Sequence, residues 1–263
     1  RAAARHFIDA KVDAVIGHFA SDSAAAVVES YAQAGIPLIL PASTCAALTD
    51  AGKTTFRICA SDRLLATRLI EFAKAEGLKR VALFTDPSLH GRQQMHELRE
   101  AAQLSTVEVV DDVNNADAMV FCGRLKASRQ FLVDKRANGC ELPLFFTDDA
   151  ASPALVEGLE RTGTVFVISF PMAGGLAEAQ SFDATYQQIY AEQAPVYAVE
   201  TLAAFALVDR AAADQRELLH ALRFDHFATP AGPVSFRDGE NSHARVSLWV
   251  YTDEHAHERR LLC

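Results

Sequence analysis

The chain has 263 residues, of which 50% are hydrophobic and 22% are charged, and its formal net charge at pH 7 is −9. This balance is typical of a globular protein and excludes a mainly disordered chain. The acidic charge argues against nucleic-acid binding, which usually needs a basic face. Because no apolar run approaches the about 18 residues that a membrane-spanning helix needs, we expect a soluble protein.

Helical and strand-like patterns alternate along the first half of the chain. Helices are predicted over residues 2–10, 23–34, 63–76, 91–103 and 127–138, and strands over 12–17, 36–41, 56–60, 80–86, 107–110 and 117–123. Gly35 and Gly77 follow two of these helices directly, where glycine commonly ends a helix. The strands are continuous apolar runs, as expected when both faces of a sheet are covered.

The second half continues the alternation and ends differently. Strands are predicted over 143–149 and 164–170, and helices over 152–159, 178–193, 196–213 and 215–222. The tail is typical of paired strands around a turn at Asp238–Gly239. Strands separated by helices indicate an α/β fold with mostly parallel sheets.

One connection is too short for this scheme. Only residues 111–116 separate the strand at 107–110 from the strand at 117–123. A crossover between parallel strands needs a dozen residues or more. The first of these strands therefore lies outside the sheet, or runs antiparallel, or has lost the helix that would normally follow it.

Candidate functional residues are sought after the strands, because α/β sheets bind ligands at the carboxyl ends of their strands. The residues that follow the predicted strands are His18, Phe19, Ala20, Ser21, Ala42, Ser43, Thr44, Pro87–His90, Arg124, Asp148, Asp149, Pro171 and Met172. Several are hydroxyl or charged side chains, which suit a small polar ligand.

The order and spacing of several segments resemble one family. The segments are VDAVIGHFAS, GIPLILPAST, FRICASD, RVALFTDPSLHG, PLFFTDDA and AGPVSFRDGENSHARVSLWVY. Together they resemble the periplasmic leucine/isoleucine/valine-binding proteins, which are type I solute-binding proteins of ABC importers. The likeness extends over nearly the whole chain.

The resemblance implies a two-lobed type I periplasmic-binding-protein fold, in which each lobe is a mostly parallel sheet flanked by helices. Lobe 1 is expected over 1–61 and 172–236, and lobe 2 over 62–171 and 237–263. Crossovers are expected near Ser61–Asp62, Pro171–Met172 and Phe236–Arg237. The family begins with a strand and a helix upstream of Arg1, so this first unit is expected to be missing.

The resemblance also implies a ligand site for an amino acid, whose carboxylate and ammonium both lose water on burial and need partners. Ser21, Ala42 and Thr44 match the positions that bind the α-carboxylate and ammonium, and Ser43 between them is a further candidate ligand residue. Asp148 replaces a glutamate that pairs with the ammonium. Two plainer interpretations stay open. Ser43 or Thr44 could cap the helix near Ala46, and Asp148 or Asp149 could cap the helix over 152–159.

The other end of the implied pocket departs from the family pattern. Phe19, Ala20 and Tyr197 match positions that are apolar or aromatic, whereas His90 and Arg124 stand where the family has tyrosines. A desolvated guanidinium needs an anion, so we hypothesise a ligand with a polar or acidic side chain or a second carboxylate. Alternatively, Arg124 pairs with Asp148 or Asp149 and closes a degenerate site.

The resemblance implies a solute-binding protein that captures an amino acid or related small carboxylate between the lobes and delivers it to a membrane permease, in the periplasm. No enzymatic activity is expected, since GxSxG, GxGxxG and P-loop patterns are missing. No cofactor or metal is expected either. The alternatives are a ligand sensor of the same fold, a degenerate member that acts through protein contacts, and a hydrolase built on Cys45 with His18 or His90.

Overall fold

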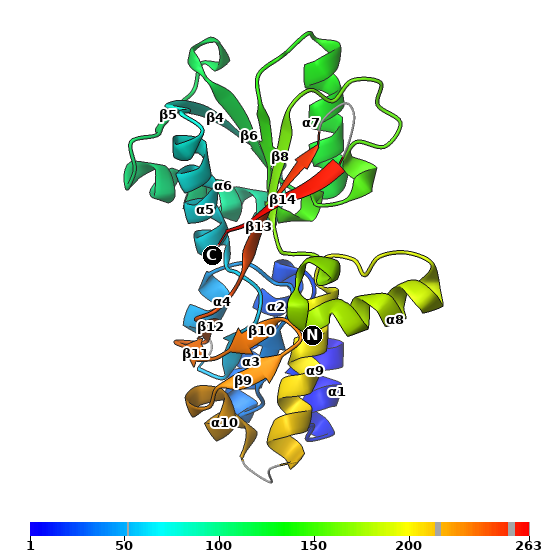
Figure 1. Cartoon of the computed structure of the whole chain (residues 1–263). Helices are drawn as coiled ribbons and strands as arrows, with labels where there is room; N and C mark the ends of the chain where they lie inside the picture. The colour runs from blue at the N-terminus through cyan, green and yellow to red at the C-terminus, as the bar shows by residue number, and fades with distance from the viewer. Residues whose placement is uncertain (52, 214–216, 252–255, 263) are drawn as a thin grey trace. The chain divides into compact units, whose positions relative to one another are not determined.

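The computed structural model describes residues 1–51, 53–213, 217–251 and 256–262, and these residues form two compact units (Figure 1). Unit 1 comprises Arg1–Ser61 and Pro171–Arg245, and unit 2 comprises Asp62–Phe170 and Val246–Cys263. The third crossover lies later than the expected position near Phe236–Arg237. The reason is that β11 (Phe236–Arg237) and β12 (Glu240–Asn241) pair within the sheet of unit 1.

Unit 1 is built on a five-stranded sheet in the order β1-β2-β3-β12-β11. Its first strands, β1 (Val15–Ile16), β2 (Leu38–Leu40) and β3 (Thr55–Arg57), are parallel to one another. β12 runs parallel to β3 and antiparallel to β11, around a turn at Asp238 and Gly239, where both residues have positive φ. The turn predicted from the sequence is therefore confirmed. A separate hairpin joins β9 (Phe227–Thr229) to β10 (Gly232–Val234).

Both faces of the unit 1 sheet are covered, as the continuous apolar strands predict. Leu38 and Leu40 pack with Tyr31 in one core cluster, whereas Ile39 packs with Leu207 in another. This alternation is the period of two that a strand imposes. The α-helices of unit 1 are α1 (Ala2–Asp9), α2 (Ser21–Ala25), α3 (Val28–Ala34), α4 (Ala47–Ala51), α8 (Gln180–Tyr190), α9 (Ala198–Ala213) and α10 (Leu218–Phe224).

Unit 2 is built on a seven-stranded sheet in the order β14-β13-β8-β7-β6-β4-β5. The parallel strands are β4 (Arg80–Thr85), β5 (Glu108–Val110), β6 (Ala118–Cys122), β7 (Leu144–Phe146) and β8 (Val165–Ser169). β13 (Val246–Tyr251) runs antiparallel to both β8 and β14 (Ala256–Leu262). The flanking helices are α5 (Asp62–Ala75), α6 (Leu89–Gln103) and α7 (Leu125–Ala137), and α5 packs against α6 (Figure 1).

The order of the strands explains the short connection between β5 and β6. β5 lies in the sheet and parallel to β4, so two of the three interpretations, a strand outside the sheet and an antiparallel strand, are wrong. β5 and β6 lie on opposite sides of β4, and the link between them contains only the 3₁₀ helix η1 (Val113–Asn115).

Three predicted helices differ from those observed. Residues 23–34 form two helices, because the backbone leaves the helical region at Val27. The helix predicted over 178–193 is shorter, with the 3₁₀ helix η5 (Ala177–Ala179) before α8. Residues 215 and 216 of the predicted helix over 215–222 lie outside the described residues, and α10 begins at Leu218.

The helix predicted over 152–159 is wrong, since only the 3₁₀ helix η3 (Pro153–Leu155) forms there. The side chain of Arg129 donates hydrogen bonds to the carbonyl oxygens of Ala154, Leu155 and Glu157. These bonds satisfy acceptors that a helix would have paired with its own N–H groups. No helix among the described residues is long and apolar enough to cross a membrane.

Candidate functional site

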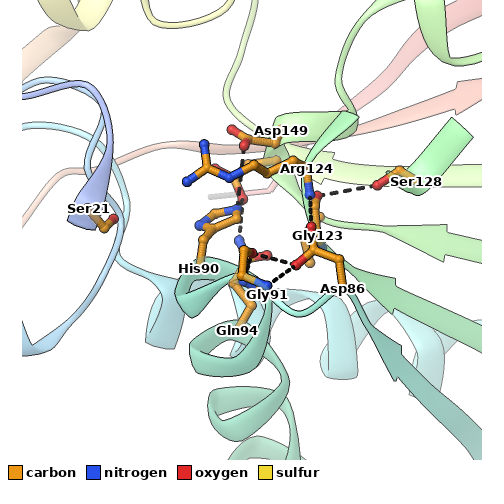
Figure 2. A network of polar contacts seen from close by, with 12 residues as sticks. Ser21, Asp86, His90, Gly91, Gln94, Gly123, Arg124, Ser128 and Asp149 are labelled. Carbon is orange, nitrogen blue, oxygen red and sulfur yellow. Dashed lines mark hydrogen bonds and ion pairs between the residues drawn. The ribbon is translucent and has the colours of Figure 1, made fainter. Parts of the chain in front are cut away.

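Charged side chains of unit 2 converge at the carboxyl ends of three neighbouring parallel strands (Figure 2). Asp86 follows β4, Arg124 follows β6, and Asp148 and Asp149 follow β7. His90 comes from the first turn of α6. The structure thus brings together His90, Arg124 and Asp148, the three predicted site residues of this unit.

Asp86 organises the start of two helices. One carboxylate oxygen, Oδ1, accepts hydrogen bonds from the backbone N–H and the hydroxyl of Ser88, and the other, Oδ2, accepts from the backbone N–H of Arg124 at 3.0 Å. Ser88 in turn caps α6 by accepting from the backbone N–H of Gly91 at 3.0 Å. Burial opposes ionisation of Asp86, but these hydrogen bonds and nearby His90 hold its pKa below the ordinary value.

Two glycines allow this close packing. A Cβ on Gly91 would lie 2.5 Å from Asp86 Oδ1 and 2.7 Å from the backbone oxygen of Cys122. A Cβ on Gly123 would lie 2.9 Å from the Asp86 carboxylate. Because real Cβ atoms do not approach other atoms so closely, both positions require glycine for the strand ends to meet.

His90 faces two carboxylates at distances beyond a hydrogen bond. Its Nε2 lies 3.9 Å from Asp148 Oδ1 and 3.8 Å from Asp149 Oδ2. The His90 side chain is 8% exposed, Asp148 1% and Asp149 20%. Burial lowers the pKa of His90, but the charges of Asp148, Asp149 and Asp62 outweigh it and raise that pKa above the ordinary value.

Gln94 connects two buried carboxylates of the cluster. It lies one helical turn after His90, and its side-chain Nε2 donates to Asp148 and, at 3.2 Å, to Asp62. Gln94 is 3% exposed and Asp62 is 2% exposed. The sequence analysis did not select either as a site residue. The available signal was the spacing of Gln94 four residues after His90, which puts both on one helix face.

Arg124 precedes α7 as its N-cap residue and is half-buried. In the view of Figure 2 its side chain runs between His90 and Asp149, and its charge opposes protonation of His90. The cluster therefore holds a guanidinium and an imidazole next to several buried carboxylates, which gives it groups for both an ammonium and an anion.

Asp148 and Asp149 do not cap a helix over 152–159, because that helix does not form. Asp148 instead begins the 3₁₀ helix η2 (Asp148–Ala150). The side chain that caps η3 is Ser152, whose hydroxyl accepts from the backbone N–H of Ala154. Asp148 is thus buried at the end of β7 without a helix that would require it there.

The predicted site residues of unit 1 lie in two loops, after β1 and after β2. The hydroxyl of Ser43 donates to the carbonyl oxygens of His18 and Phe19, at 2.5 and 3.1 Å, and so ties the two loops together. The hydroxyl of Ser21 accepts from the backbone N–H of Cys45 at 3.4 Å. In the capping interpretation Ser43 was a candidate cap for α4, but its hydroxyl donates to the other loop.

The remaining predicted residues of unit 1 differ in exposure. Ala42 and Thr44 are buried, whereas Ala20 is half-buried and precedes α2. Phe19 is 63% exposed, and its ring meets the half-buried ring of Tyr197 edge-on at 5.3 Å between centroids. Tyr197 has a positive φ of 72°, which is uncommon for a non-glycine residue. The helices after these loops, α2 and α4, have five residues each, so their dipoles are small.

A buried arginine that the sequence analysis missed holds the second loop. Arg57 is 0% exposed and donates to the carbonyl oxygens of Ser43 at 2.9 Å and Cys45 at 2.7 Å. Its side chain also bonds Glu240 at 3.2 Å. The available signal was a lone charge in the apolar segment FRICA, since such a residue is buried only with partners. Cys45, proposed as a nucleophile in the hydrolase alternative, is 5% exposed within an apolar core cluster.

Comparisons with known proteins agree with this architecture. A family model described as a periplasmic binding protein matches residues 1–133, just over half of the chain. No curated protein matches. Among solved structures, an ABC transporter substrate-binding protein from Desulfitobacterium hafniense, in complex with Leu, is 22% identical with a TM-score of 0.84, and the match covers 98% of this chain and 84% of that chain.

Two further solved structures have the same fold. LivJ from Streptococcus pneumoniae, in complex with isoleucine, is 20% identical with a TM-score of 0.84 over 99% of this chain and 82% of that chain. A solute-binding protein from Rhodopseudomonas palustris, in complex with 3,4-dihydroxybenzoic acid, is 17% identical with a TM-score of 0.78 over 98% and 81%. The fold is that of type I periplasmic binding proteins, and the chain belongs to the periplasmic binding protein family.

Proposed function

We propose that the chain is the solute-binding protein of an ABC importer and that it captures an amino acid or a related small carboxylate. The observation that carries this proposal is the convergence of His90, Arg124, Asp148 and Asp149 at the strand ends of unit 2. Ligands of α/β sheets bind at such strand ends. The protein transforms no substrate, and its partner is a membrane permease.

The chemistry of the cluster supports a zwitterionic solute with an additional polar or anionic group. Asp148 and Asp149 supply negative charge for an ammonium, which forms strong charge-assisted hydrogen bonds with carboxylates. Arg124 supplies a planar guanidinium, which matches the two oxygens of a carboxylate. The planar guanidinium therefore favours a solute with a carboxylate or other polar group at this end over one with only an aliphatic side chain.

Unit 1 supports the same class of solute. Ser21 and Thr44 are hydroxyl residues of the two tied loops, and they are our candidates for the α-carboxylate. Phe19 offers an exposed aromatic face backed by Tyr197. Solutes of the structurally similar proteins include leucine, isoleucine and 3,4-dihydroxybenzoic acid, all of which carry a carboxylate. Family membership supports a location outside the cytoplasm, in the periplasm.

A ligand screen tests the proposal. Neutral, acidic and aromatic carboxylates and amino acids are added to the purified protein, and the melting temperature is recorded. A ligand that binds only the folded state raises this temperature by mass action. We expect the largest rise with an acidic or polar amino acid, followed by a measurable dissociation constant in titration calorimetry.

The variant Arg124→Gln tests the role of the guanidinium. It should weaken binding of the acidic ligand on the order of tenfold or more, as expected for the loss of a charged hydrogen-bonding partner. The matched control is Arg99→Gln, which removes an exposed arginine from α6 and should leave affinity unchanged. If no amino acid or small carboxylate raises the melting temperature, the degenerate alternative replaces this proposal.

A further inference from the structure

The spacing of three side-chain atoms in unit 2 suits a shared ion. His90 Nε2 lies 3.9 Å from Asp148 Oδ1 and 3.8 Å from Asp149 Oδ2, and one ligand atom from each residue lies within 4.8 Å of the others. These distances are too long for hydrogen bonds. Zinc binds nitrogen and oxygen at about 2.0–2.2 Å, which places tetrahedral ligands about 3.4 Å apart. A shift of roughly half an ångström would bring the two distances from His90 to that spacing.

A second, independent feature is the state of the His90 ring. His90 is 7% exposed, and its Nε2 has no hydrogen-bond partner among the described residues. A buried polar atom without a partner is costly, so it needs an explanation such as an ion. In Figure 2 the ring lies between the start of α6 and Asp149, with Nε2 directed toward the carboxylates.

The surroundings of the three residues also suit a cation. Asp62 and Asp86 add two buried carboxylates, while Arg124 is the neighbouring permanent cation in the described cluster. Gln94 donates from its side chain to Asp148 and so fixes the direction of that carboxylate. Ligating carboxylates are commonly oriented by such an outer hydrogen bond.

We propose that His90, Asp148 and Asp149 bind a divalent first-row transition metal ion, with Zn²⁺ as the reference ion. An imidazole ligand favours such an ion over Ca²⁺ and Mg²⁺, which prefer oxygen ligands alone. Three protein ligands leave a coordination position for water or for a ligand atom. From the sequence alone no metal is expected, and His90 lies far from Asp148 and Asp149 along the chain.

The metal site shares His90, Asp148 and Asp149 with the proposed solute site, but it does not depend on that function. The two proposals predict opposite effects at Arg124. Removing this positive charge should tighten metal binding, because like charges repel. The same change should weaken binding of an acidic solute. Failure of the metal proposal can therefore be told apart from failure of the solute-binding proposal.

The test is calorimetric titration of the full chain, stripped of metal with a chelator, with Zn²⁺ alone and then with Co²⁺ monitored by visible absorption. We expect one site that is weakened on the order of tenfold or more by His90→Gln and by Asp149→Asn. The matched control is His96→Gln, which removes an exposed histidine from the same helix and should change nothing.

Two results would overturn the metal proposal. One is Zn²⁺ affinity that is equal in His90→Gln, His96→Gln and the unmodified chain. The other is affinity that falls in Arg124→Gln. Melting curves recorded in chelator show whether each variant folds. If His90→Gln does not fold, Asp149→Asn is the test variant instead. Solute binding measured in chelator tests the solute-binding function separately.

Discussion

Arg57 and Glu240 form a partly buried ion pair in unit 1, with both Nε and Nη2 of the guanidinium 3.2 Å from the same carboxylate oxygen. That oxygen also accepts from the hydroxyl of Thr49 at 2.6 Å. Arg57 is completely buried, whereas the Glu240 side chain is 35% exposed. The pair joins β3 and β12 to the loop that carries Ser43 and Thr44.

Replacing Arg57 by alanine should therefore destabilise the protein strongly. The change removes the guanidinium donor from the carbonyl oxygens of Ser43 and Cys45 and the cationic partner of Glu240. Each hydrogen bond to a charged donor is worth about 1.5–3 kcal/mol, and the ion pair adds less than a fully buried one because Glu240 is partly exposed. Urea denaturation should show this loss in the free energy of unfolding.

The matched control is Arg63→Ala, because the Arg63 side chain is 65% exposed and pairs with Glu97 at 3.5 Å. Exposed pairs contribute about 0–1 kcal/mol. Equal losses in the two variants would contradict the role given to Arg57.

The spacing of apolar residues predicts the strands and most helices, because the formation of these elements depends mainly on burying one apolar face. They also place His90, Arg124 and Asp148 at strand ends, which the structure brings to one edge of the unit 2 sheet. They do not predict Arg57 or Gln94 as organising residues. The partners of these side chains lie far along the chain or depend on register, as with Arg57 and Glu240.

The helix predicted over 152–159 does not form for a similar reason. The local sequence favours a helix, but Arg129 on α7 satisfies three of its carbonyl oxygens and Gly158 has a positive φ of 72°. A tertiary contact thus replaced the local hydrogen bonds. Local helix propensity contains no information about a hydrogen-bond donor that belongs to another helix.

Gly91→Ala should destabilise the protein, against the usual trend. In an ordinary helix, alanine is more favourable than glycine by about 1 kcal/mol. Here the new Cβ would overlap the backbone oxygen of Cys122, at 2.7 Å, and the Asp86 carboxylate. We expect a lower melting temperature and weaker solute binding, since α6 must move from β6. A higher melting temperature would show that a Cβ at position 91 fits against Asp86 and Cys122, and would contradict this prediction.

Glu200 should give the protein a pH-dependent stability. It is 5% exposed, and burial raises its pKa from 4.5 to about 7. The folded state therefore keeps the proton up to about pH 7, whereas the unfolded chain loses it near pH 4.5. The contribution of Glu200 to the free energy of unfolding should fall as pH rises through this window, by up to about 1.4 kcal/mol per pH unit.

The variant Glu200→Gln should remove this fall, because glutamine stays neutral at every pH. Urea denaturation at several pH values from 4.5 to 7.5, compared with the exposed control Glu192→Gln, measures the difference. Parallel pH profiles for Glu200→Gln and Glu192→Gln would mean that Glu200 is ionised in the folded protein.

Phe19→Ala should separate binding from folding. Phe19 is 63% exposed, so its removal loses little burial, and its edge-on contact with Tyr197 is worth about 0.5–1.5 kcal/mol. If the solute packs on this ring, affinity should fall several-fold while the melting temperature changes little. Phe224→Ala is the control, because Phe224 is 68% exposed and its ring neighbours His220 instead. Titration calorimetry with the ligand found by screening gives the answer. Equal affinity in both variants would remove Phe19 from the proposed site and leave the polar residues to define it.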